Sequence, residues 1–106
     1  MLNRFSARVE SLTVGTSAAA SSELVMSEFA MGMFFVPAGS SITTITWYAA
    51  VKAGGTYFAA YDEFVSAITQ VVSASKAYQL PSGLCGAAAI KAVGDAAGTI
   101  AVVLKG

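Results

Sequence analysis

Short apolar segments alternate with turn residues along most of this chain, and this spacing constrains its fold most. From Glu23 onward the turns recur at intervals of about 8 to 12 residues. The clearest segment, 42–51, places Ile45 and Trp47 on one face and Tyr48 on the other, because successive side chains of a strand point to opposite sides. The pattern predicts an all-β sandwich or barrel.

The other predicted strands are also short runs bounded by Gly, Pro, Asp or Ser. They cover residues 23–26, 31–36, 56–61, 68–72, 77–80, 87–93 and 99–104. About eight short antiparallel strands suit a two-sheet sandwich of the jelly-roll kind. Gly54-Gly55 and the segment 94–98 are both predicted to form hairpins, since glycine tolerates the backbone angles that tight turns need.

The N-terminal part reads differently from the rest. Residues 16–22 are small and polar, as in a linker or loop. We therefore divide the chain into an extended N-terminal arm or linker, 1–22, and a β-sandwich domain, 23–106. The first 12 residues lack a long apolar core after their positive charge, so they make a poor signal peptide.

The composition argues against several classes of partner. Hydrophobic residues make up 56% of the chain and charged residues 11%, and six basic residues balance six acidic ones. No net charge is available to attract nucleic acid. The most apolar stretch, 29–38, is about half of a membrane span and contains Gly32 and Pro37, so we expect no membrane segment. One cysteine, Cys85, cannot form an intrachain disulfide and fits a reducing compartment.

The residues give little support to catalysis. The chain has no histidine, which removes Ser-His and Cys-His nucleophile pairs and most zinc sites. Asp62 and Glu63 are adjacent carboxylates that read as a solvated turn, and with Asp95 they make only a weak candidate for a calcium site. We expect no catalytic residue, no cofactor, no metal and no enzymatic activity.

Aromatic residues gather in one predicted hairpin, where Trp47, Tyr48 and Tyr57 are the main members. They can serve as core and cross-strand pairs. The alternative is an exposed platform for a sugar or another protein. We therefore take all three as candidate partner-binding residues.

The order of motifs resembles small β-sandwich structural proteins from the virions of tailed bacteriophages, of the capsid decoration or cement type. The resemblance rests on a Pro-Ala-Gly-Ser turn at 37–40, a strand of Ile and Thr at 42–48, a Gly-Gly-Thr hairpin at 54–56 and a Tyr-Asp end at 61–62. It continues through 77–81, 86–93, 95–99 and 102–106, and so covers residues 23–106.

The resemblance implies a structural protein that binds and stabilises a phage shell. Its partners would be the major capsid protein or other virion proteins, and it would form a homo-oligomer, a trimer or a dimer. It would lie on the capsid surface of the virion after synthesis in the host cytoplasm. The N-terminal arm, with Arg4, Phe5 and Arg8, would reach over a neighbouring subunit.

Two alternatives remain open. A carbohydrate-binding module of jelly-roll type would need an exposed Trp47 or Tyr48 for stacking, so a buried Trp47 would count against it. A self-assembling fibre or surface-layer subunit is compatible with low charge and abundant Ala, Ser, Thr and Gly.

Overall fold

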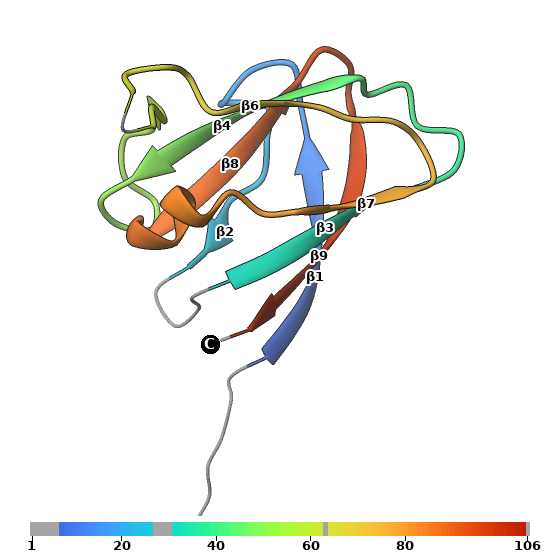
Figure 1. The fold of residues 1–106 in the computed structure, drawn as a ribbon. Helices are drawn as coiled ribbons and strands as arrows, with labels where there is room; N and C mark the ends of the chain where they lie inside the picture. The colour runs from blue at the N-terminus through green and yellow to red at the C-terminus, as the bar shows by residue number, and fades with distance from the viewer. Residues whose placement is uncertain (1–6, 27–30, 63, 106) are drawn as a thin grey trace, which may run out of the picture.

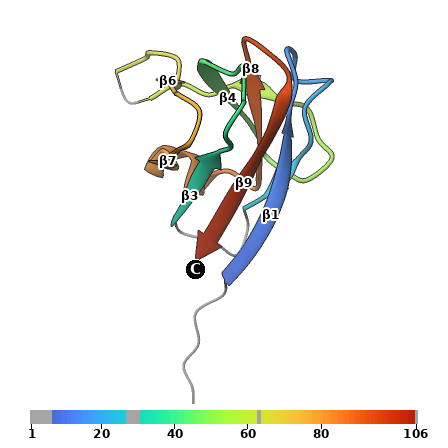
Figure 2. The ribbon, with the colours of Figure 1, turned by 90° about the vertical axis from the view of Figure 1, so that its right-hand side faces the viewer.

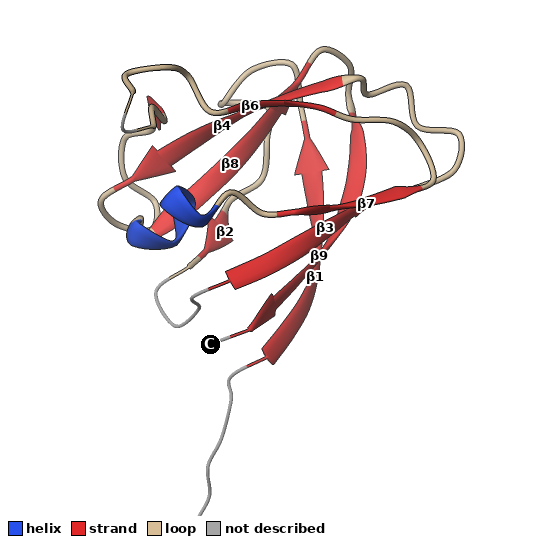
Figure 3. Ribbon diagram, in the orientation of Figure 1, coloured by secondary structure: helices blue, strands red, loops and turns tan. Residues whose placement is uncertain are grey.

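Two antiparallel β-sheets face each other in this protein (Figure 1). The computed structural model describes residues 7–26, 31–62 and 64–105. The strands are β1 (Ala7–Val14), β2 (Leu24–Val25), β3 (Met31–Val36), β4 (Thr44–Ala50), β5 (Phe58–Ala59), β6 (Thr69–Val71), β7 (Lys76–Gln79), β8 (Ala89–Gly94) and β9 (Gly98–Lys105). One 3-10 helix, η1 (Ser82–Gly86), drawn blue in Figure 3, precedes β8. No helix in these ranges is long and apolar enough to cross a membrane.

The chain passes repeatedly from one sheet to the other. The first sheet has the strand order β1-β9-β3-β7, and the second has β2-β8-β4-β5, with β6 also paired to β4. Strands β5 and β6 occupy one edge position, because β5 lies opposite Tyr48 and Ala49 while β6 lies opposite Thr44 to Thr46. This connectivity is that of a jelly roll. The predicted fold class is therefore confirmed, with one of about eight strands interrupted by a loop.

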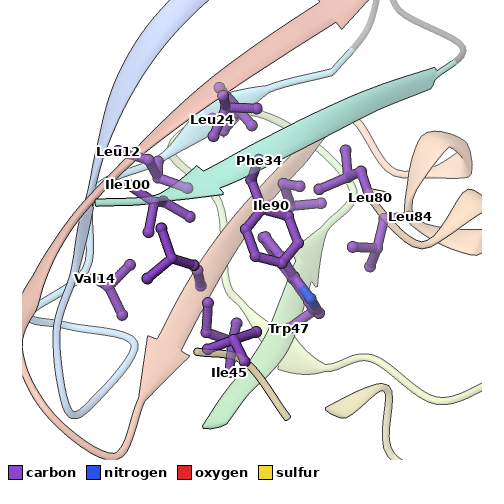
Figure 4. Close-up of a cluster of buried hydrophobic side chains, with 14 of the residues drawn as sticks. Leu12, Val14, Leu24, Phe34, Ile45, Trp47, Leu80, Leu84, Ile90 and Ile100 are labelled. Carbon is purple, nitrogen blue, oxygen red and sulfur yellow. The ribbon is translucent and has the colours of Figure 1, made fainter. Parts of the chain in front are cut away.

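The alternation seen in the sequence builds the core between the sheets. Ile100, Val102 and Leu104 of β9 point inward and are at most 1% exposed. Ile45 and Trp47 of β4 meet them from the second sheet and are fully buried. Figure 4 shows Ile45, Trp47 and Ile100 among the side chains that fill the space between the two layers.

Aromatic rings form the centre of this core. Phe34 of β3 presents an edge-on contact to Trp47, with the ring centroids 5.5 Å apart and the planes at 67°. Phe34 also stacks on Tyr78 of β7, with the ring centroids again 5.5 Å apart. Such pairs add to the stabilisation that burial alone provides. The structural interpretation of Trp47, as a core residue, is confirmed.

The predicted boundary of the N-terminal arm is wrong for residues 7–14. This segment forms β1, which pairs with β9 over eight residues, from Ala7 opposite Lys105 to Val14 opposite Gly98. Leu12 and Val14 are buried in the core. The sequence signal for this strand was the period-2 spacing of Leu12 and Val14. Residues 1–6 lie outside the described part of the chain.

Only one of the two predicted hairpins exists. Gly54 has a φ of +75° and the N–H of Gly55 donates to the carbonyl of Lys52 at 3.0 Å, in the turn between the paired strands β4 and β5. The segment 94–98 instead connects β8 in the second sheet with β9 in the first. Turn residues specify that the chain reverses, but they do not specify which sheet receives the next strand.

Replacing Phe34 and Phe35 separately by alanine tests the core. Phe34→Ala should lower the free energy of unfolding by about 3–5 kcal/mol, because it leaves a cavity beside Trp47. Phe35, its neighbour on the opposite face, is 41% exposed, so Phe35→Ala should cost less than about half of that. Chemical denaturation measures both losses, and equal losses would contradict the assigned faces of β3.

Candidate functional site: an apolar sheet face

The outer face of the first sheet is unusually apolar. Met31, Met33 and Phe35 of β3 point away from the core and are 62%, 42% and 41% exposed. Val9 of β1 is 73% exposed on the same face, and Val103 of β9 is half-buried between them. We call these five residues the apolar face. An antiparallel sheet with one face in water normally places polar residues there, so this face is suited to contact with another molecule.

Strand register brings the apolar face together from distant parts of the sequence. Val9 lies opposite Val103, Val103 lies opposite Met33, and Met33 lies opposite Gln79, which makes one row across four strands. Figure 2 shows β3, β9 and β1 side by side. A groove of about 550 Å³ follows β3 here, and Gln79 and Lys105 supply its polar margin.

The outer face of the second sheet has a different character. Thr44, Thr46 and Tyr48 of β4 are half-buried there, and the hydroxyl oxygens of Thr46 and Thr69 are 3.2 Å apart. Lys91 of β8 lies opposite Tyr48. The two outer faces of the sandwich are thus chemically unequal, and the apolar one is the better candidate for a protein interface.

The predicted partner-binding residues that the structure describes, Arg8, Trp47, Tyr48 and Tyr57, do not form one site. Arg4 and Phe5 lie outside the described residues. Arg8 is half-buried on the inner side of β1, where its Nη2 donates to the carbonyl of Val25 at 2.8 Å and its Nε lies 2.8 Å from Glu10 Oε2.

Trp47 requires a correction, because its ring is fully buried. Its indole N–H donates to Oε1 of Gln70 at 2.6 Å, so the polar atom is also engaged inside the protein. Trp47 therefore cannot present a binding platform. Tyr48 lies half-buried on the polar outer face of the second sheet, apart from Trp47.

Tyr57 belongs to a small charged cluster. Its hydroxyl and the N–H of Gly54 both donate to Oε2 of Glu23. These bonds, that of Gly54 first, lower the pKa of Glu23, while burial and then the bond to Glu23 raise the pKa of Tyr57. The Nζ of Lys91 lies 4.6 Å from the centre of the Tyr57 ring and donates to the carbonyl of Ala18 at 2.9 Å. The cluster ties the β1–β2 and β4–β5 loops to each other and to β8, so Tyr57 has a structural role within the molecule.

The carboxylates considered for calcium are used separately. Asp95 accepts the N–H groups of Thr43 and Thr44 at 2.9 and 3.1 Å and the hydroxyl of Thr43. Asp62 Oδ1 accepts the N–H groups of Phe64 and Ser66. Glu63 lies outside the described residues. Among the residues that are described, no three His, Cys, Asp or Glu side chains gather as a metal-binding group.

The apolar face was missed by sequence reasoning, although a signal for it was present. In the β3 segment, residues of both parities are apolar: Phe34 and Val36 point inward, while Met33 and Phe35 point outward. A strand that is apolar on both faces is expected to be covered on both. The prediction of a strand at 31–36 therefore also implied a covered outer face.

Comparison with known proteins supports the architecture. No family model and no curated protein matches the sequence. Among solved structures, the crystal structure of the SPBc2 prophage-derived protein YomS is similar, with a TM-score of 0.62 over 100% of this chain and 98% of that chain. The two sequences are 12% identical. A prophage-derived protein of similar extent therefore shares this fold.

Asp95→Asn tests the contacts of Asp95 with β4. Hydrogen bonds to the charged carboxylate, that of the Thr43 side chain first, lower the pKa of Asp95 to about 2 from an ordinary value of 3.8. The stabilisation is therefore present above about pH 4 and is lost as the pH falls toward about 2. Thermal melts should show Asp95→Asn below the wild type near neutral pH, with the gap closing in acid. A gap of constant size down to about pH 2 would contradict the assignment.

Proposed function

We propose that this protein is a structural virion protein that attaches to a phage capsid as a decoration or cement protein, with its apolar face against the shell. The observation that carries the proposal is that Met31, Met33 and Phe35 are exposed along one strand of the first sheet, beside Val9 and Val103 on the same face. The fold shared with a prophage-derived protein and the resemblance to virion β-sandwich proteins support the phage assignment.

The chemistry of the apolar face suits a protein partner. Burying apolar surface contributes about 25 cal/mol per Å², and methionine side chains adapt to an irregular opposing surface. With only 11% charged residues, the chain does not depend on ion pairs for attachment. Many copies on one shell would make weak individual contacts effective together. The expected partner is the major capsid protein or another virion protein.

The proposed role is non-catalytic. The chain has no histidine, and the carboxylates of Asp62 and Asp95 accept backbone N–H groups of nearby loops. The carbohydrate-binding alternative loses its main support, since Trp47 is buried. A fibre or surface-layer subunit would also use an apolar face, and the experiments below separate it from the capsid assignment.

Charged substitutions on the two outer faces test the binding surface. Met33→Glu places a charge in the centre of the apolar face, so binding to purified shells that lack the protein should fall by roughly tenfold or more. Val71→Glu is the matched control, because Val71 is 81% exposed and points outward from the second sheet. Co-sedimentation with shells measures both. Equal binding by the two variants would contradict the proposed surface.

The copy number in particles tests the capsid assignment itself. Mass spectrometry of particles purified on a density gradient should find the protein in a simple ratio to the major shell protein. A few copies per particle would indicate a tail or vertex position instead. Absence from particles, with recovery of the chain in filaments, would replace the capsid assignment by the fibre alternative.

A further inference from the structure

Among the described residues, none pairs with a short stretch of the outer backbone edge of strand β1. It is an outer strand of the first sheet, and β9 covers only one of its sides. The N–H of Thr13 donates to Ser22 Oγ at 2.8 Å, and its carbonyl accepts the N–H of Ser22 at 3.1 Å. The backbone groups of Thr13 therefore face away from β9. Because this direction alternates along an antiparallel strand, those of Ala7, Val9 and Ser11 face away from β9 as well.

The loop after β1 sets the limit of this edge. Ser22 occupies the edge at Thr13, and the N–H of Gly15 donates to Ser21 Oγ at 3.0 Å. The C-terminal end of the β1 edge is thus covered by the chain itself. Within the described part of the strand, the stretch from Ala7 to Ser11 stays available for pairing, and Figure 2 shows no strand beyond β1 on that side.

We propose that a second copy of this chain pairs with that open stretch, β1 to β1 in antiparallel direction, about a two-fold axis through Val9. Ala7 of one copy then lies opposite Ser11 of the other, and Val9 lies opposite Val9. An open edge strand is a template for such pairing. In a two-fold contact the open stretch of each copy pairs with the same stretch of the other, so this contact joins two copies and no more.

Charge selects this register among its neighbours. Arg8 and Glu10 lie on the same side of β1 and form an ion pair within the strand, with side chains 37% exposed. If the two-fold axis passes through Val9, Arg8 of each copy lies opposite Glu10 of the other copy. An axis through Arg8 or through Glu10 would instead place two arginines or two glutamates directly opposite each other, which is destabilising. An axis through Ser11 would require the backbone of Thr13 to pair with the second copy, but its outward groups already bond to Ser22.

The pairing also extends the apolar face. Val9 points outward beside Val103, so the two copies of Val9 would meet at the centre of a sheet to which each chain contributes its strands β1, β9, β3 and β7. The two apolar faces then become one continuous surface on the same side. The paired stretch from Ala7 to Ser11 makes a small interface, so we expect dimerisation to depend on protein concentration.

Charge reversal at two positions tests the dimer in the purified protein, without shells. Arg8→Glu and Glu10→Lys each bring like charges into opposition, so each variant alone should sediment as a monomer where the wild type sediments as a dimer. An equimolar mixture of the two should regain the dimer mass, because the two acidic side chains of one variant then face the two basic side chains of the other. Lys76→Glu is the control for Arg8→Glu, since it makes the same charge change on β7 at the opposite edge of the sheet.

A backbone variant provides an independent test. Val9→Pro removes an N–H that faces away from β9, so circular dichroism should still report the folded sandwich while the dimer is lost. A monomeric wild type at every concentration would overturn the proposal, as would a mixture of the two charge variants that stays monomeric. These outcomes are independent of shell binding, since a monomer can still attach through the apolar face.

Discussion

The two sheets are held together around the indole ring of Trp47, whose single polar atom needs a partner once it is buried. Gln70 of β6 supplies the partner: its Oε1 accepts the indole N–H at 2.6 Å, while its Nε2 donates to the carbonyl of Gln79 in β7 at 3.2 Å. One side chain thereby links the core, the second sheet and the first sheet. Leaving the indole unpaired would cost about 1–3 kcal/mol. Phe34 packs against the same ring, so this contact joins β3 of the first sheet to β4 of the second.

Much of the architecture could be predicted from the sequence because inward and outward residues alternate strictly. Ile45 and Trp47, like Ile100 and Val102, have the period that a half-buried strand requires. The limits of β3 were predicted correctly for another reason, because Pro37 and the turn residues after it end the apolar run. What could not be predicted depends on distant partners: β1 becomes a strand through its pairing with β9, and 94–98 changes sheet because β9 pairs with β1 and β3.

The candidate site was harder to predict than the fold. Trp47 and Tyr57 were predicted to bind a partner because they are aromatic. In the structure Trp47 is buried, and both side chains form hydrogen bonds within the molecule. The apolar face instead combines Val9, Met33 and Val103, which are far apart in the sequence and become neighbours only through strand register. Both the proposed attachment to a shell and the proposed dimer use this sheet, one through its face and the other through its edge.

The interruption between β5 and β6 has a consequence for how this protein can vary. Ala60 and Ile68 flank the loop, and both are bonded to Trp47 of β4; the N–H of Ile68 also donates to the carbonyl of Ala60 at 2.9 Å. The loop is therefore closed at its base by the sheet. Doubling the length of such a loop costs only about 0.6 kcal/mol of closure entropy. Foreign peptides inserted within 61–67 could thus be displayed at one end of the sandwich while the base of the loop keeps its bonds to β4.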